Sequence, residues 1–78
     1  MDLSSAVRQR IINLLKENNM TMWGLFKASG VPRSTLSYFM NGKRDLINLT
    51  TLLHICEGFN LTLKDFFDDP LFDDVEQE

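Results

Sequence analysis

Residues 21–44, TMWGLFKASGVPRSTLSYFMNGKR, contain two short helical patterns separated by a tight turn. Thr21 is a good N-cap for the first helix, and apolar residues then recur at helical spacing. Gly30 follows them and can take the left-handed conformation that commonly ends a helix. The second helix is expected to begin near Pro32, whose fixed φ suits a first turn, and to end at Asn41. The pattern predicts a helix-turn-helix.

The second helix divides into two faces when its residues are placed at 100° intervals. One face is apolar and should be buried, and it consists of Leu36, Phe39 and Met40. The other carries polar groups of short or medium length, namely Arg33, Ser34, Ser37, Tyr38 and Asn41. Such groups suit DNA bases and phosphates, whereas a merely solvated face more often carries Glu and Lys. Arg33 lies in the first turn, where a helix in the major groove contacts bases, and it could donate two hydrogen bonds to a guanine.

Residues 21–67 resemble the Cro and lambda-repressor type of helix-turn-helix domain, the Xre-like family. The matching positions are Thr21, Leu25, Gly30-Val31, Ser34-Thr35-Leu36-Ser37 and Asn41-Gly42-Lys43-Arg44. The sequence NLTTLLHICEGFNLTLKDFF that follows resembles the family's fourth helix and the start of its fifth. The resemblance implies an all-α, compact five-helix DNA-binding domain over residues 1–67, in which helices 2 and 3 form the helix-turn-helix.

The candidate DNA-binding residues combine the polar helix face with the start of the preceding helix and the basic residues after it. They are Thr21, Met22, Arg33, Ser34, Thr35, Ser37, Tyr38, Asn41, Lys43 and Arg44. Lys43 and Arg44 follow a glycine at a helix end, where basic side chains can grip the DNA backbone. The alternative for these two residues is a solvated basic loop.

Three positions around the two helices depart from the family's pattern, and a fourth, Trp23, has two interpretations. Met22 replaces a glutamine that reaches a phosphate, so only its backbone N–H, near the positive end of a helix, could point at one. Phe26 replaces a small alanine, and Pro32 stands where the family prefers a serine cap. Trp23 is either a core or dimer residue, which is the interpretation we favour, or an exposed aromatic residue near DNA.

The N-terminal helix is expected to begin at a cap at Ser4 or Ser5. Arg8 and Arg10 could contact phosphate, but a solvated or ion-paired helix surface is the simpler interpretation. In the family, an arginine at the position of Arg10 pairs with a glutamate, and Met40 stands where that glutamate would be. We therefore expect Arg10 to lack its family partner.

Length and composition indicate a single domain. A chain of 78 residues with 44% apolar side chains can bury a small helical core. Cys56 is the single cysteine, so an intramolecular disulfide is impossible. No apolar run approaches the roughly 18 residues of a membrane span, and the N-terminus lacks a signal-peptide pattern. These features predict a soluble, cytoplasmic protein.

The net charge of −3 is unevenly distributed along the chain. Residues 1–64 hold eight basic and four acidic side chains, a net charge of +4, whereas residues 65–78 hold seven acidic side chains and no basic one, a net charge of −7. Salt screens exposed charges beyond about 8 to 10 Å. The acidic end is therefore compatible with DNA binding if it lies away from the DNA-binding face.

No pattern in the chain indicates catalysis. His54 and Cys56 would lie on different faces of a helix that Asn48 is expected to cap, and no second pair of metal ligands accompanies them. The apolar side chains of this helix should supply the core or a partner surface: Leu49, Leu52, Leu53, Ile55, Cys56 and Phe59. We expect a buried Cys56, a His54 at the surface, no metal, no cofactor and no enzymatic activity.

The C-terminal part carries more large apolar side chains than one small domain obviously needs. We interpret the surplus as a homodimer surface formed by Phe66, Phe67, Leu71, Phe72 and Val75. Residues 68–78 are treated as an acidic C-terminal tail that could join this surface. The alternative is a fraying tail that contributes nothing else.

These expectations combine into a sequence-specific DNA-binding transcriptional regulator, acting as a repressor. A homodimer would bind a palindromic operator, with its two recognition helices in successive major grooves about 34 Å apart. The alternative is a protein-interaction module, an antitoxin or a regulatory subunit, on the same scaffold with weak or no DNA binding.

Overall fold

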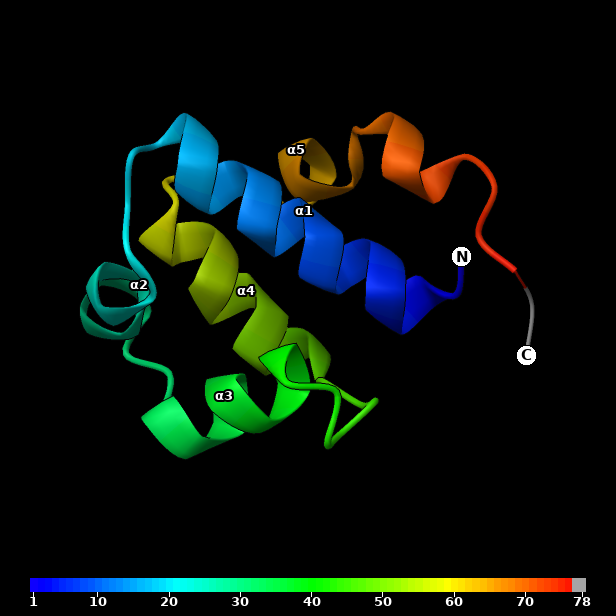
Figure 1. Ribbon diagram of the computed structural model, residues 1–78. Helices are drawn as coiled ribbons and strands as arrows, with labels where there is room; N and C mark the ends of the chain where they lie inside the picture. Colours follow the sequence, from blue (N-terminus) through cyan, green and yellow to red (C-terminus); the bar gives the residue numbers. More distant parts are fainter. Residues whose placement is uncertain (77–78) are drawn as a thin grey trace.

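The computed structural model describes residues 1–76 and has the expected all-α, five-helix architecture, followed by one short 3-10 helix (Figure 1). The elements are α1 (Leu3–Glu17), α2 (Met22–Ser29), α3 (Arg33–Met40), α4 (Leu49–Gly58), α5 (Leu63–Phe67) and η1 (Pro70–Phe72). The helices α1 and α4 cross the middle of the molecule, with α3 on one side and α5 and η1 on the other. Over the described residues, no helix combines the length and the apolar character that a membrane span requires.

Side-chain caps determine where most of the helices begin. Thr21 and Asn48 accept hydrogen bonds of 3.0 and 2.7 Å from the backbone N–H three residues later, as expected from the sequence. Thr62 caps α5 in the same way, at 3.0 Å. The predicted cap of α1 at Ser4 or Ser5 is wrong. Asp2 caps this helix, because its carboxylate accepts the N–H of Ser5 at 2.8 Å.

Left-handed residues end several of the helices. Gly30 follows α2 with a φ of +71°, which a side chain would disfavour. Asn19 and Asn60 have φ values of 52° and 60° after α1 and α4, in the conformation that asparagine tolerates best among residues with a side chain. The turns between helices are therefore largely determined by local sequence.

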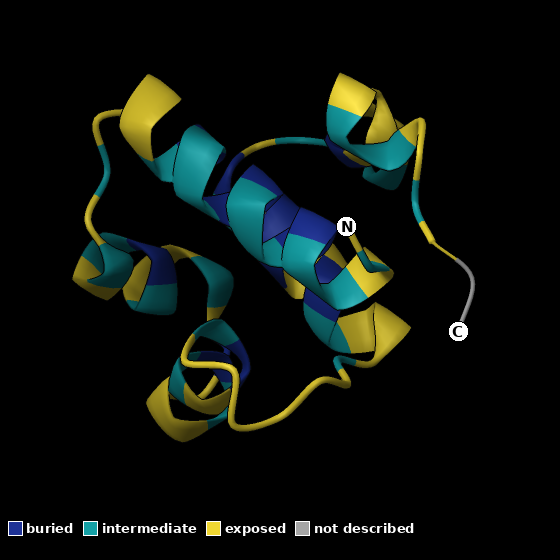
Figure 2. Cartoon of the chain, turned by 45° about the vertical axis from the view of Figure 1, so that its right-hand side comes forward, coloured by how far each residue is buried: buried dark blue, intermediate teal, exposed yellow. Residues whose placement is uncertain are grey.

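The core is a single apolar cluster enclosed by the helices, with the buried residues on their inward sides (Figure 2). It contains Val7, Ile11, Leu14, Leu25, Val31, Leu36, Phe39, Leu52, Ile55, Cys56, Phe59 and Phe66. Leu49 and Leu53, which were expected in the core or on a partner surface, are exposed. Cys56 is buried as expected, and burial raises the pKa of its thiol, which favours the unreactive protonated form at neutral pH.

Arg10 ties the C-terminal segment to α1. Its guanidinium donates to the carbonyls of Phe66 at 2.8 Å and Asp65 at 3.0 Å, and it pairs with Asp69 at 3.1 Å. The simpler interpretation from the sequence is a solvated or ion-paired helix surface. Arg10 is only 8% exposed, so it is not solvated, but the expected ion pair is present. The family partner is absent, as expected, but Asp69 takes its place from the opposite end of the chain.

The residues after α5 are packed as far as residue 76. The helix η1 lies against α1, and the ring of Phe72 stands 6.0 Å from that of Phe66 and 4.9 Å from that of Phe67. The backbone N–H of Glu76 donates to the carbonyl of Met1 at 3.1 Å. Residues 68–76 thus cover α1 rather than fray. The end of the predicted tail, residues 77–78, lies outside the described residues.

Candidate nucleic-acid interface

The helices α2 and α3 form a helix-turn-helix that is held against the core by its apolar residues. The helix α2 packs on α4 and buries Leu25, and Val31 in the turn is buried as well. The backbone N–H of Val31 donates to the hydroxyl of Ser29 at 3.2 Å, which fixes the turn. Because α3 buries Leu36 and Phe39, its opposite face must point outward.

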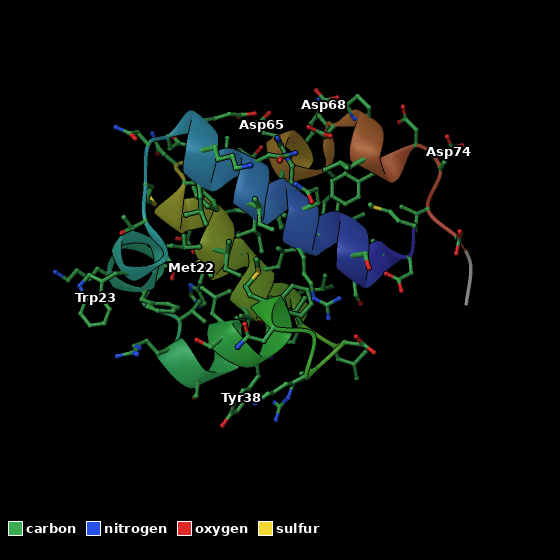
Figure 3. The ribbon with its side chains drawn as sticks, in the orientation of Figure 1. Met22, Trp23, Tyr38, Asp65, Asp68 and Asp74 are labelled. Atoms are coloured by element: carbon green, nitrogen blue, oxygen red, sulfur yellow. The ribbon has the colours of Figure 1, made fainter. Side chains whose placement is uncertain are left out.

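The outward face of α3 carries the polar residues expected from the sequence. Arg33, Ser34, Tyr38 and Asn41 are exposed, and Thr35 and Ser37 are half-buried. The phenol of Tyr38 points away from the body of the molecule (Figure 3). The predicted division of this helix into two faces is confirmed, and the face can present a guanidinium, hydroxyls, a phenol and an amide to a ligand.

Arg33 lies beside two aromatic residues of α2. The carbon at the centre of its guanidinium is 5.2 Å from the ring centroid of Trp23 and 5.9 Å from that of Phe26. Trp23 is 53% exposed, so it is not a core residue, whereas its place in a dimer surface stays a prediction. Its ring lies at the surface of α2 beside the first turn of α3, a position that the sequence pattern alone did not reveal.

The loop after α3 folds back onto the end of that helix. The backbone N–H groups of Lys43 and Arg44 both donate to the carbonyl of Tyr38, at 3.0 and 3.2 Å, and Gly42 makes this turn possible with a φ of +76°. The ammonium group of Lys43 is 6.0 Å from the ring centroid of Tyr38. Two exposed basic side chains are thereby held next to the outward face of α3.

Arg8 braces this loop from α1. An ion pair of Arg8 was expected, but its hydrogen bonds to the backbone of α3 and of the loop were not. Its Nε donates to the carbonyl of Phe39 at 2.6 Å, while its Nη2 donates to the carbonyl of Arg44 at 3.1 Å and pairs with Asp45 at 3.0 Å. The guanidinium also lies 4.8 Å from the ring centroid of Phe39. Arg8 is therefore committed to protein groups, and it positions the basic loop rather than offering a free cation.

The two candidate residues at the start of α2 have structural roles in the free protein. The hydroxyl of Thr21 accepts the N–H of Gly24 as the helix cap, and the side chain of Met22 is half-buried against the core. Both residues stand at the N-terminal end of α2, where backbone N–H groups favour an anion. A contact of Met22 with phosphate would thus have to come from its backbone, as expected from the sequence.

The acidic side chains of the C-terminal part lie far from this face. Asp65, Asp68 and Asp74 are on the side of the molecule opposite to Tyr38, with α1 and α4 between them (Figure 3). The shortest dimension of the molecule, 21 Å, is itself about two screening lengths at physiological salt, so charges on opposite sides interact weakly. The acidic end therefore neither covers α3 nor cancels its local charge.

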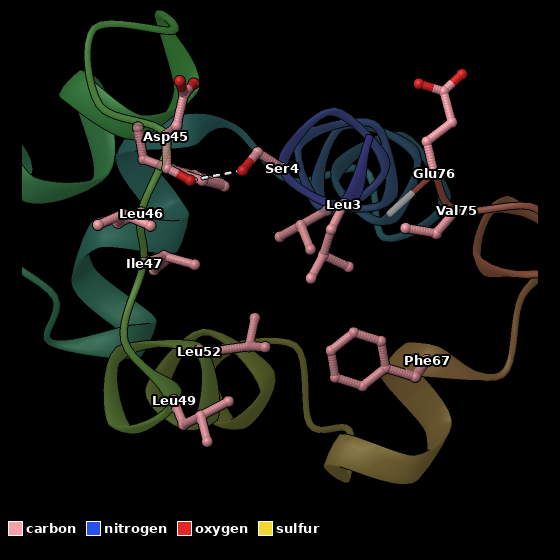
Figure 4. Close-up of a pocket in the computed structure, with 12 residues that line it drawn as sticks. Leu3, Ser4, Asp45, Leu46, Ile47, Leu49, Leu52, Phe67, Val75 and Glu76 are labelled. Atoms are coloured by element: carbon pink, nitrogen blue, oxygen red, sulfur yellow. Dashed lines mark hydrogen bonds between the residues drawn. The ribbon is translucent and has the colours of Figure 1, made fainter. Parts of the chain in front are cut away.

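The predicted dimer residues differ in how far the monomer buries them. Phe66 is fully buried in the monomer, which removes it from any partner surface, and Leu71 and Phe72 are half-buried. Phe67 and Val75 instead line a groove of about 560 Å³ between the start of α1, the loop before α4 and the C-terminal segment (Figure 4).

The groove brings together exposed apolar residues that sequence analysis did not group. Leu46 and Leu49 are 82% and 75% exposed, and Leu3 from α1 lies across from them. Their exposure could not be read from the sequence, since Leu46 lies in an irregular loop and Leu49 shares a helix with core residues.

Within residues 1–76, no cluster of His, Cys, Asp or Glu side chains could hold a metal ion. His54 is at the surface, as expected, and its Nδ1 lies 3.2 Å from the carboxylate of Glu57 on the same helix.

A buried turn, an outward polar helix and adjoining cations define a helix-turn-helix DNA-binding domain. Residues 10–70 match the family model for the Cro/C1-type helix-turn-helix DNA-binding domain, and the chain belongs to this family of DNA-binding regulators. Among solved structures it is similar to the prophage Lp1 protein 11, with a TM-score of 0.82, 24% identity, and coverage of 96% of this chain and 100% of that one. At this identity the similarity concerns the fold. No curated protein matches the chain significantly.

Proposed function

We propose that this chain is a sequence-specific transcriptional regulator that inserts α3 into the major groove of DNA. The observation that carries the proposal is the outward face of α3, which is polar without being acidic and begins with the exposed Arg33. In such a placement Arg33 reads a base, and Ser34, Ser37, Tyr38 and Asn41 contact bases or phosphates. Lys43 and Arg44 hold the phosphate backbone beside the groove.

The regulator acts as a repressor and binds its operator as a homodimer. A single eight-residue helix spans few base pairs, and a second copy doubles the site that is read. Repression requires only that the protein occupies a site near a promoter. Because a homodimer has two-fold symmetry, the operator that it binds is expected to be palindromic.

The groove lined by Leu3, Leu46 and Leu49 is the proposed surface for the second copy. It opens next to the loop after α3, so a partner bound there would stand beside the DNA-binding face. Phe67 and Val75 remain part of this surface, whereas Phe66 does not.

A second candidate function is a protein-interaction module, an antitoxin or a regulatory subunit. The observation that favours it is the same groove, because its exposed side chains Leu46 and Leu49 lie together, and exposed apolar patches commonly mark protein–protein contacts. The two candidates differ in whether the chain selects a DNA sequence.

Selection of bound duplexes from a random pool tests the first candidate. We expect a short consensus that repeats as an inverted pair about one helical turn apart. If the recovered duplexes share no sequence, the chain does not read DNA, and the interaction module becomes the better account.

Two substitutions separate base reading from backbone binding at the selected site. Arg33→Ala should reduce the preference for one base pair by about ten- to a hundredfold, because a bidentate contact with guanine is lost. Lys43→Ala should weaken binding to all sequences alike and reduce the salt slope by about one unit. Titrations at several salt concentrations measure both effects. An unchanged preference in Arg33→Ala would mean that another residue reads the bases.

A further inference from the structure

We propose that Trp23 and Phe26 are positioning residues that hold the guanidinium of Arg33 ready to read a base. This inference rests on the proposed function, since it concerns how the same site obtains its specificity. It assigns a role to two aromatic residues of α2. Phe26 replaces a small residue of the family pattern and packs partly against the core, and Trp23 is mostly exposed.

The geometry that supports the inference is a corner formed by two rings. Trp23 and Phe26 are three residues apart on α2 and therefore lie on the same side of the helix. Their ring centroids are 6.3 Å apart and the ring planes meet at 83°. The guanidinium of Arg33 lies within 6 Å of both centroids, at 5.2 and 5.9 Å.

The corner can restrict a side chain that would otherwise be mobile. A free arginine samples many rotamers, and the loss of this freedom on binding opposes the contact with DNA. The electron-rich faces of aromatic rings attract a guanidinium and favour a limited set of orientations. Arg33 is exposed in the free protein, so the N–H groups at the rim of its guanidinium can meet the acceptor edge of a guanine.

Lys27 provides a second cation beside the same indole. Its ammonium group is 5.6 Å from the ring centroid of Trp23, one helical turn further along α2. Being flexible and compact, this cation suits a phosphate rather than a defined base edge. Lys27→Ala is therefore the matched control, because it removes a cation from the same ring without removing the support of Arg33.

The first test needs no DNA. Trp23 is the single tryptophan of the chain, and a ring stacked on Arg33 shifts the side-chain proton resonances of this arginine upfield. We expect the shift in the wild type and in Lys27→Ala, and its loss in Trp23→Leu. If Arg33 in the wild type has the chemical shifts of a free side chain, the inference is wrong. This outcome does not depend on whether the protein binds DNA.

The second test measures discrimination at the site selected by the wild type. Trp23→Leu should lower the preference at the base pair read by Arg33 by about three- to tenfold, and Trp23→Phe should restore part of it, because an aromatic face is kept. Lys27→Ala should weaken binding to all sequences and leave the preference intact. Thermal unfolding of each variant checks that the exposed Trp23 can be replaced without loss of the fold.

A double-mutant cycle shows whether Trp23 acts through Arg33. In the Arg33→Ala background, Trp23→Leu should cause no further loss of discrimination, because the group that it positions is absent. Additive losses would mean that Trp23 contacts DNA itself, and they would overturn the inference while leaving the proposed function intact. If the wild type has no sequence preference, both the inference and the proposed function are wrong.

Discussion

At the scale of single residues, the basic side chains fall into two groups with different tasks. Arg8 and Arg10 are held by backbone carbonyls and carboxylates, so their charges are used to join distant segments. Lys27, Arg33 and the two basic residues after α3 are exposed around the helix-turn-helix. Composition counts all of these residues alike, and only their partners separate structural cations from cations available to DNA.

Arg10→Ala should destabilise the fold by about 2 to 3 kcal/mol. The change leaves Asp69 and two carbonyls without their donor in a largely buried place. Urea unfolding followed by circular dichroism measures the loss. Lys16→Ala, which removes an exposed cation from the same helix, is the control and should change the free energy of unfolding by less than about 0.5 kcal/mol. Equal effects of the two changes would show that the contacts of Arg10 do not stabilise the fold.

At the scale of elements, the helix-turn-helix is supported by the close approach of α2 to α4. A Cβ atom added to Gly58 would lie 3.1 Å from Cβ and 3.2 Å from the backbone nitrogen of Ser29, and 3.2 Å from a methyl group of Leu25. The glycine thus lets α4 approach the end of α2. This contact sets the tilt of the pair α2 and α3 against the core, and hence the direction in which α3 faces.

Gly58→Ala should destabilise the protein by about 1 kcal/mol, although alanine is intrinsically the better helix former by a similar amount. The added methyl group would push against the backbone of Ser29, which cannot rotate away. Gly24→Ala is the comparison, because its added methyl group would meet the flexible side chain of Met20 at 3.2 Å, and it should be neutral or stabilising. Thermal unfolding of the two variants gives the sign of each effect, and shifts in the same direction would contradict this account.

At the scale of the whole molecule, charge and apolar surface are distributed on separate sides. The face with α3 is basic, the opposite side is acidic, and the groove with exposed leucines lies at the edge between the α3–α4 loop and the C-terminal segment. The negative net charge is thus a property of the whole chain that the DNA-binding face does not share. A symmetric partner in the groove would leave both basic faces open.

Leu49→Asp should convert the proposed homodimer into a monomer. A carboxylate at this position would have to be buried in an apolar interface, in a groove that the carboxylates of Asp45 and Glu76 also line. Sedimentation equilibrium of the two proteins measures the change. Thr50→Asp adds the same charge at the neighbouring exposed position and should remain dimeric. A wild type that stays monomeric at millimolar concentration would exclude this use of the groove.

The sequence by itself determined the local features of this protein. Caps at Thr21, Asn48 and Thr62, the left-handed Gly30, and the polar and apolar sides of α3 were all readable, because each depends on residues within one or two turns. The family resemblance added the order of the five helices. These features are short-range, and a pattern of residue types encodes them directly.

Only the tertiary structure decided which distant residues meet. The pairing of Arg10 with Asp69, the stacking of Arg33 on Trp23, the burial of Phe66 and the groove around Leu49 all join separate elements. Such contacts depend on the angles and distances at which helices pack. A charged or aromatic side chain is compatible with several neighbours until that packing selects one of them.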